Sequence, residues 1–248
     1  MRTIIWLIRA FFYVVSAVPD MNRATRLRRA GDMDAFYDLV DTRVRDFADK
    51  ALSFAGVTLE IHGQENFTGE PAVIMANHQS DFDIPILLSC MDKPYGMVAK
   101  MGIKKIPLIR TWMDHIGCTF IDRSNARESI KALNEAGRNI PAGRSVVIFP
   151  EGKRSKGEDM ARFGSGAFKT AFKYNAPVIP VVIDGSYKIM EANHGKWIKP
   201  QHIIVTVLPA IPTAGMDKAE QKALPDRIRQ DLIEAREKSR ASYKVNDL

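Results

Sequence analysis

The chain has 248 residues, 46% of them hydrophobic, which suits one large α/β domain with appendages. The sequence contains no linker-like stretch that would indicate two domains. Its formal net charge of +7 favours an anionic partner, which is nucleic acid, a membrane surface or a phosphorylated substrate. Nucleic acid is disfavoured, because the sequence has no helix-turn-helix, zinc-finger or RNP-like pattern. Cys90 and Cys118 have apolar neighbours and no metal-like spacing, so we expect buried free thiols.

The first segment, residues 4–18, is an apolar run interrupted only by Arg9 and Ser16. Fifteen helical residues span about 22 Å, whereas the hydrocarbon core of a bilayer is about 30 Å thick. An arginine in the middle of such a segment costs roughly 2.5 to 3.5 kcal/mol unless it reaches the interface. We therefore expect a helix that lies in or dips into one leaflet. The alternative is a signal peptide, because residues 15–17 resemble a cleavage site.

A basic cluster follows within residues 23–29, and each of its arginines adds about 1 kcal/mol near an anionic leaflet. The alternative is a solvated loop. Asp32 can cap a second helix that runs to about residue 54 with its apolar residues on one face. Residues 1–55 are therefore expected to form a two-helix membrane-docking motif, followed by an α/β domain over residues 56–248.

Residues 56–248 alternate between strand-like and helix-like segments. Strands are predicted at residues 57–62, 72–76, 96–99, 117–121, 145–149, 178–183 and 203–208. Helices are predicted at residues 84–91, within 103–116, at 125–137 with a capping pair of Asn125 and Glu128, at 165–174 and at 218–240. Strands separated by helices indicate an α/β fold with a largely parallel or mixed sheet that is flanked by helices.

Residues 77–83 read Asn-His-Gln-Ser-Asp-Phe-Asp and come directly after a predicted strand, where α/β proteins usually keep their sites. On one helix, His78 and Asp83 would lie about 140° apart and would not face each other. Pro85 is tolerated only in the first turn of a helix, so the helix begins near Asp83 and leaves His78 on the preceding loop. Asp83 can then bind one imidazole nitrogen and leave the other as a base. The alternative is an N-cap aspartate beside a turn histidine.

Three further motifs follow in order. Residues 117–123 read Gly-Cys-Thr-Phe-Ile-Asp-Arg, residues 149–155 read Phe-Pro-Glu-Gly-Lys-Arg-Ser, and residues 178–181 read Val-Ile-Pro-Val. With residues 77–83 they resemble the four blocks of the glycerolipid acyltransferases, specifically the PlsC-like family of 1-acyl-sn-glycerol-3-phosphate acyltransferases. The resemblance covers about residues 77–184, and it implies an α/β catalytic domain that carries an N-terminal two-helix membrane anchor.

The resemblance also implies the reaction. His78 would act as a general base, with Asp83 as its orienting carboxylate, and would take the proton from a glycerol hydroxyl that attacks an acyl thioester. A positioned base typically contributes about 10² to 10⁴ in rate, because an alcohol does not ionise at neutral pH. No acyl-enzyme is required, and Ser80 lacks the G-x-S-x-G surroundings of a nucleophile.

The block at residues 149–155 is associated in the family with binding of the acceptor. Arg154 is expected to hold the acceptor phosphate in a forked contact, and Gly152 to let the backbone approach the ligand. Glu151 is expected either to bind the glycerol or to hold Arg154.

Arg123 and Lys100 are second-rank candidates for phosphate binding. For Arg123 the alternative is a salt bridge with Asp122 or a solvated loop charge. The chain departs from the family in having Lys153 where threonine is commonest, and in having Met-Gly after Lys100 where Lys-Glu is frequent. Both departures concern the acceptor site and not the base.

The sequence therefore predicts an acyltransferase that esterifies the sn-2 hydroxyl of lysophosphatidic acid and gives phosphatidic acid. The expected partners are acyl-CoA or acyl carrier protein as donor and anionic lipids of the membrane, with no cofactor and no metal. The expected location is the inner, cytoplasmic face of the cell membrane, as a peripheral or monotopic protein. One alternative is another lysophospholipid or a lyso-aminolipid as acceptor, and the other is a non-catalytic lipid-binding protein of the same fold.

Overall fold

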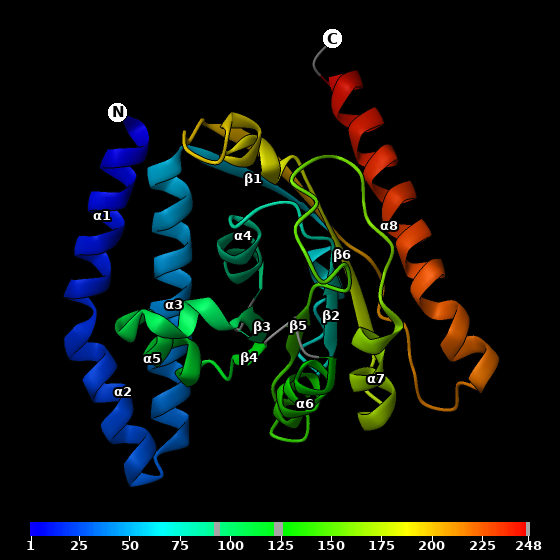
Figure 1. Ribbon diagram of the computed structural model, residues 1–248, viewed down its shortest axis with the longest axis horizontal. Helices are drawn as coiled ribbons and strands as arrows, with labels where there is room; N and C mark the ends of the chain where they lie inside the picture. The colour runs from blue at the N-terminus through cyan, green and yellow to red at the C-terminus, as the bar shows by residue number, and fades with distance from the viewer. Residues whose placement is uncertain (92–94, 122–125, 247–248) are drawn as a thin grey trace.

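The computed structural model describes residues 1–91, 95–121 and 126–246, in which a seven-stranded sheet lies between two groups of helices (Figure 1). The strand order is β1-β7-β6-β2-β5-β3-β4. Each described strand pairing is parallel except that of β6 with β7, which is antiparallel. The strands are β1 (Val57–His62), β2 (Val73–Ala76), β3 (Gly96–Lys100), β4 (Thr119–Ile121), β5 (Val146–Ile148), β6 (Val178–Asp184) and β7 (Gln201–Val207). The prediction of an α/β fold with a largely parallel, mixed sheet is confirmed.

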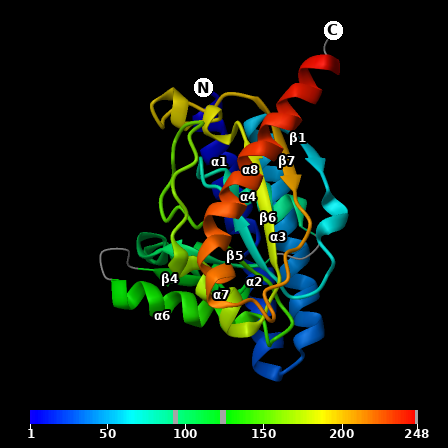
Figure 2. The same cartoon turned by 90° about the vertical axis from the view of Figure 1, so that its right-hand side faces the viewer.

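Both faces of the sheet are covered, which explains why its central strands are continuously apolar. Alternate side chains of a strand point to opposite faces. Ile74 and Ala76 of β2 accordingly join the core on the side of the N-terminal helices, and Val73 and Met75 join the core on the other side. The helices after β1 are α4 (Asp83–Cys90), α5 (Pro107–His115), α6 (Ala126–Ala136), α7 (Ser165–Tyr174) and α8 (Lys218–Asn246), of which α7 and α8 cover the second side (Figure 2).

Several predicted boundaries differ from the observed ones, most of them by one or two residues. The strand predicted from residue 117 begins at Thr119, because Gly117 adopts a positive φ of 78° in the turn after α5 and cannot extend the strand. The last helix continues to Asn246, beyond the predicted end at residue 240. The predicted cap of α6 by Asn125 lies outside the described residues.

The N-terminal segment forms a helical hairpin whose first arm is longer than predicted. It consists of α1 (Arg2–Ser16), α2 (Val18–Ala30) and α3 (Met33–Ala55). The helices α1 and α2 meet at Ala17 with a bend of 41° and run together beside α3 (Figure 1). The basic residues within 23–29 therefore lie on a helix and not in a loop, because the arm continues past the bend.

The second arm belongs to the core of the protein. Asp32 caps α3 as predicted, with its Oδ1 accepting a hydrogen bond from the backbone N–H of Ala35 at 3.3 Å. Phe36, Val40 and other residues of one face of α3 are buried in the same apolar cluster as the sheet. The hairpin is thus packed on the α/β fold through α3.

The first arm presents a different surface. No residue of α1 is buried. Its large apolar side chains that stand exposed are Ile4, Ile5, Leu7, Ile8, Phe11, Phe12 and Val15. Within the described part of the chain, no single helix combines the length and apolar character that a bilayer span requires, whereas α1 and α2 together meet that test across their bend.

Candidate active site

The end of β2 and the start of α4 bring His78 and Asp83 together, as the sequence predicted. The imidazole Nδ1 of His78 lies 2.8 Å from Oδ2 of Asp83. The same oxygen accepts the backbone N–H groups of Gln79 at 2.6 Å and Ser80 at 2.9 Å. A carboxylate can only accept hydrogen bonds, so the proton of a neutral His78 resides on Nδ1. Nε2 makes no hydrogen bond to any described residue, and it is the nitrogen available for proton transfer.

The orienting carboxylate is itself held from a second strand. Ser186, in the turn after β6, donates its hydroxyl hydrogen to Oδ1 of Asp83, and both side chains are fully buried. Gln79 completes this link, because its Oε1 accepts the backbone N–H of Gly185 at 3.1 Å. We did not predict Ser186 or Gln79 as site residues. The available signal was that β6 ends in a polar Asp-Gly-Ser turn, like the turn that follows β2.

The loop after β5 supports His78 from the other side. The imidazole stacks on Phe149 with 4.1 Å between ring centroids and 19° between planes. Glu151 Oε1 accepts the backbone N–H of His78 at 2.7 Å, and its Oε2 accepts that of Ala161 at 2.9 Å. Burial raises the pKa of Glu151, although these two N–H groups act in the opposite direction. Glu151 therefore fixes the backbone of the histidine turn, a role that we did not predict, and within the described structure it makes no hydrogen bond or ion pair with Arg154.

Arg154 lies beside the histidine turn and is paired with two carboxylates. Its Nη1 contacts Oδ2 of Asp81, and it lies 3.3 Å from Oε1 of Glu191. Glu191 also accepts the hydroxyl hydrogen of Ser80 at 2.6 Å and the backbone N–H of Asp81 at 3.0 Å. The guanidinium expected to bind phosphate is therefore present at the site, but its charge is already compensated. Glu191 lies in the connection between β6 and β7, where no motif indicated a site residue.

The remaining residues predicted to bind the acceptor are Gly152, Lys100 and Arg123. Gly152 adopts a positive φ of 70°, which glycine tolerates best, and a Cβ there would meet no atom within 4 Å. The turn conformation alone thus accounts for the glycine. Lys100 ends β3, is exposed and lines the cavity described below. Arg123 and Asp122 lie outside the described residues.

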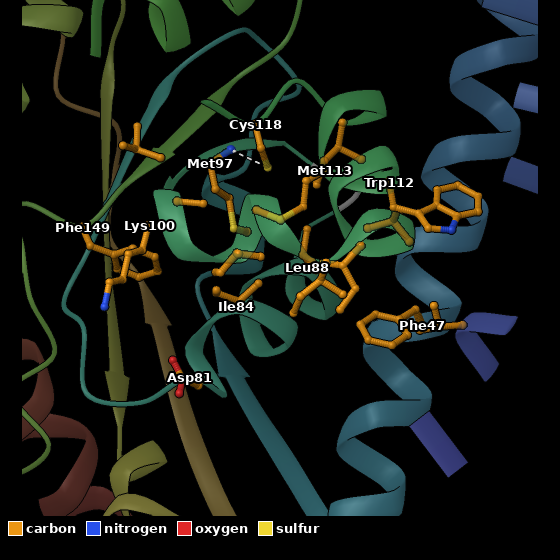
Figure 3. A pocket seen from close by; sticks show the side chains of 18 of the residues that line it. Phe47, Asp81, Ile84, Leu88, Met97, Lys100, Trp112, Met113, Cys118 and Phe149 are labelled. Carbon is orange, nitrogen blue, oxygen red and sulfur yellow. Dashed lines mark hydrogen bonds between the residues drawn. The ribbon is translucent and has the colours of Figure 1, made fainter. Parts of the chain in front are cut away.

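His78 is one of the residues that line a cavity of about 890 Å³. Figure 3 shows this cavity from close by. Apolar side chains from the hairpin, α4, β3 and α5 form most of its wall. In Figure 3, Asp81 and Lys100 lie on one side of the cavity, whereas Phe47 and Trp112 lie on the opposite side. The cavity is therefore amphipathic: most of its charged lining residues lie at the carboxyl ends of β2, β3 and β5, where His78 also lies, and Arg43 of α3 is a further cation in a largely apolar wall.

The two cysteines are buried, and Cys118 also lines the cavity. Cys90 and Cys118 are buried free thiols, as predicted, and burial raises the pKa of each to about 12. Among residues 1–91, 95–121 and 126–246, no group of three or more His, Cys, Asp and Glu side chains is arranged to hold a metal ion.

Comparisons with known proteins match both the sequence and the fold. The profile of the family described as Acyltransferase matches residues 58–184. The 1-acyl-sn-glycerol-3-phosphate acyltransferase of Saccharomyces cerevisiae is 29% identical over 195 residues, which are 77% of this chain and 64% of the yeast protein. The probable 1-acyl-sn-glycerol-3-phosphate acyltransferase of Mycoplasma pneumoniae is 35% identical over 145 residues, which are 57% of this chain and 54% of the relative. The chain thus spans less than two thirds of the length of these relatives.

The fold is also that of a solved structure. The crystal structure of the 1-acyl-sn-glycerophosphate (LPA) acyltransferase, PlsC, from Thermotoga maritima superposes with a TM-score of 0.84 at 22% sequence identity. The match covers 97% of this chain and 95% of that one, so it includes the N-terminal helices as well as the sheet.

Proposed function

The chain belongs to the acyltransferase family, whose profile matches about half of its residues, and on this premise we propose that it acylates the sn-2 hydroxyl of lysophosphatidic acid to give phosphatidic acid. The observation that carries the proposal is the pairing of His78 with Asp83 at the charged end of an apolar cavity. A fatty acyl chain suits the apolar interior of this cavity, and a phosphate suits the cationic side chains at its mouth. The names of the two relatives described above agree with this substrate.

His78 acts as the general base in this proposal. Nε2 takes the proton of the sn-2 hydroxyl as its oxygen attacks the carbonyl carbon of the acyl thioester. Asp83 holds the tautomer in which Nε2 is unprotonated, and it stabilises the imidazolium that forms. When the tetrahedral intermediate collapses, the carbon–sulfur bond breaks and the thiolate takes the proton from the imidazolium. The products are the ester and a free thiol, and no acyl-enzyme forms.

The acceptor phosphate is proposed to bind Arg154, with Lys100 as a second cation at the mouth of the cavity. A guanidinium offers a forked set of donors that matches two phosphate oxygens, whereas an ammonium acts as a point charge. Arg123 stays a candidate through the family resemblance alone. Acyl-CoA and acyl carrier protein are both anionic, so the basic chain suits either as donor.

The membrane-facing surface is proposed to be α1, together with the basic residues of α2. Phe11 and Phe12 are exposed in the structure and would lie in the leaflet, while Arg23 and the arginines that follow would meet anionic head groups. This arrangement puts a lysolipid acceptor and the mouth of the cavity at one surface. We place that surface on the inner, cytoplasmic face of the cell membrane.

The test is an assay of the purified chain, residues 1–248, in detergent micelles with lysophosphatidic acid and a labelled acyl donor. Acyl-CoA and acyl carrier protein are supplied in separate reactions, and the lipid product is separated from the donor. Labelled phosphatidic acid with either donor supports the proposal. Activity only with a different lysophospholipid or a lyso-aminolipid would replace the acceptor, and no lipid product from any acceptor would favour a non-catalytic lipid-binding protein.

A further inference from the structure

Two carboxylates share the guanidinium of Arg154, and they differ in how firmly they are held. The side chain of Glu191 is 3% exposed, whereas that of Asp81 is 60% exposed. Both contact the same nitrogen, Nη1. The three side chains together carry one net negative charge when all are ionised. A phosphate dianion that approaches Arg154 therefore meets a guanidinium whose charge is already compensated, although Lys100 lines the same cavity.

Glu191 cannot leave this arrangement at low cost. Besides Arg154, its carboxylate accepts hydrogen bonds from the hydroxyl of Ser80 and from the backbone N–H of Asp81. Breaking these contacts would leave a buried charge without compensation and two donors without an acceptor. Glu191 thus fixes the position of Arg154 relative to the histidine turn.

Asp81 is free to move away. Its carboxylate makes no hydrogen bond or ion pair with any described residue other than Arg154, and its side chain faces solvent. An ion pair between partly exposed side chains is typically worth only about 0 to 1 kcal/mol. A phosphate offers two charges and two oxygens to the forked donors of the guanidinium, so it competes well for the same position.

We propose that Asp81 is a built-in counter-ion, which the phosphate of the acceptor displaces from Arg154 while Glu191 stays in place. This inference rests on the proposed function and adds a residue that sets the affinity for an anionic acceptor. Asp81 keeps the charge of the arginine compensated before the acceptor binds. It weakens the binding of every acceptor that uses Arg154, and it leaves a neutral acceptor unaffected.

The experiment measures the binding of lysophosphatidic acid to the full chain in neutral detergent micelles by calorimetry, without an acyl donor. Asp81→Asn keeps the size of the side chain and the backbone N–H that Glu191 binds, but removes the competing charge. We expect the Kd of Asp81→Asn for lysophosphatidic acid to fall about two- to fivefold. Asp159→Asn, which removes an exposed charge from the loop after Arg154, is the matched control and should leave the Kd unchanged. Neutral 1-acylglycerol should bind wild type and Asp81→Asn equally.

A double-mutant cycle separates displacement from general repulsion. If Asp81 acts through Arg154, Asp81→Asn has no effect on the Kd in an Arg154→Gln background. An effect that persists there, an unchanged or raised Kd in Asp81→Asn, or no binding of lysophosphatidic acid by any variant would overturn the inference. Because binding is measured without turnover, an enzyme that binds lysophosphatidic acid but does not acylate it would contradict the proposed function and still decide the role of Asp81.

Discussion

Ser186 donates a hydrogen bond to Asp83, so the carboxylate that orients His78 is anchored to the turn that follows a different strand. The two residues are 103 positions apart in the sequence. The link ties the turn after β2 to the turn after β6, which is the neighbouring strand in the sheet. It makes the geometry of the proposed base a property of the sheet and not of one loop.

Removing this anchor should slow catalysis. Ser186→Ala leaves Oδ1 of Asp83 buried without that donor, and hydrogen bonds to charged groups are worth about 1.5 to 3 kcal/mol. We expect kcat to fall about tenfold with little change in KM, because the base is affected and not the acceptor site. Ser89→Ala is the matched control. Ser89 lies at the other end of α4 and donates its hydroxyl hydrogen to Asp49, so this variant also removes a serine-to-aspartate hydrogen bond. Equal kcat values in wild type and Ser186→Ala would show that Asp83 does not need the anchor.

Phe47 should influence which acyl chains fit. It lies on the far side of the cavity from Asp81 (Figure 3), so Phe47→Ala extends the apolar space away from His78. We expect Phe47→Ala to prefer donors with longer acyl chains than wild type does, when myristoyl, palmitoyl and stearoyl thioesters compete in one reaction. Phe54→Ala, on the same helix but outside the cavity lining, should keep the wild-type preference. The same product ratio in Phe47→Ala and wild type would place the acyl chain elsewhere.

The exposed face of α1 should carry membrane binding. Phe11 is 63% exposed and Phe12 is 64% exposed, so replacing both with aspartate does not disturb the core. Burying one phenylalanine is worth about 1.5 to 3 kcal/mol, so the double variant should bind anionic vesicles at least tenfold more weakly in a co-sedimentation assay. Ile130→Asp changes an exposed apolar residue of α6 and serves as the control. If the α1 variant sediments with vesicles like wild type, the membrane surface lies on another part of the protein.

His115 should make stability depend on pH. It is buried between α2 and α5, where Nε2 lies 3.2 Å from the hydroxyl of Thr25. Burial lowers its pKa, and the charge of Arg28 acts in the same direction, whereas a hydrogen bond with the backbone of Met21 and the charge of Asp114 oppose the shift. The unfolded chain, with a histidine pKa of about 6.5, therefore takes up the proton more readily than the folded chain does. The protein is therefore most stable, as far as His115 is concerned, at pH values above the pKa of the unfolded chain. The free energy of unfolding declines as the pH falls through that pKa toward the lower pKa of the folded chain.

The measurement for His115 is the free energy of unfolding in urea at a series of pH values between about 7.5 and 5.5. We expect the wild-type value to decline on acidification, and His115→Gln, which can still bond the Thr25 hydroxyl, to decline less. His194→Asn replaces an exposed histidine at a positive φ that asparagine tolerates, and it should follow the wild-type curve. Parallel curves for His115→Gln and wild type would mean that His115 does not contribute to the pH dependence of the free energy of unfolding.

The sequence was sufficient for the parts of the protein that depend on local patterns. Apolar segments and the polar, glycine or proline residues that end them predicted the strands and the hairpin. Pro85 predicted the start of α4, and with it the contact between His78 and Asp83. Contacts between distant segments were out of reach. Ser186 and Glu191 meet the histidine turn only because β6 pairs with β2, and Asp81 reaches Arg154 only because two loops meet at one edge of the sheet. Neither pairing leaves a periodic signal in the sequence.

The most direct test of the proposed mechanism is the rate of phosphatidic acid formation by His78→Ala compared with wild type, at saturating donor and lysophosphatidic acid. Unchanged circular dichroism and an unchanged Kd for the acceptor establish that the variant is folded and binds. We expect a loss of about 10² to 10⁴ in kcat, because the hydroxyl then has no positioned base. A kcat within a few fold of wild type would contradict the assignment of His78, and with it the mechanism proposed for this site.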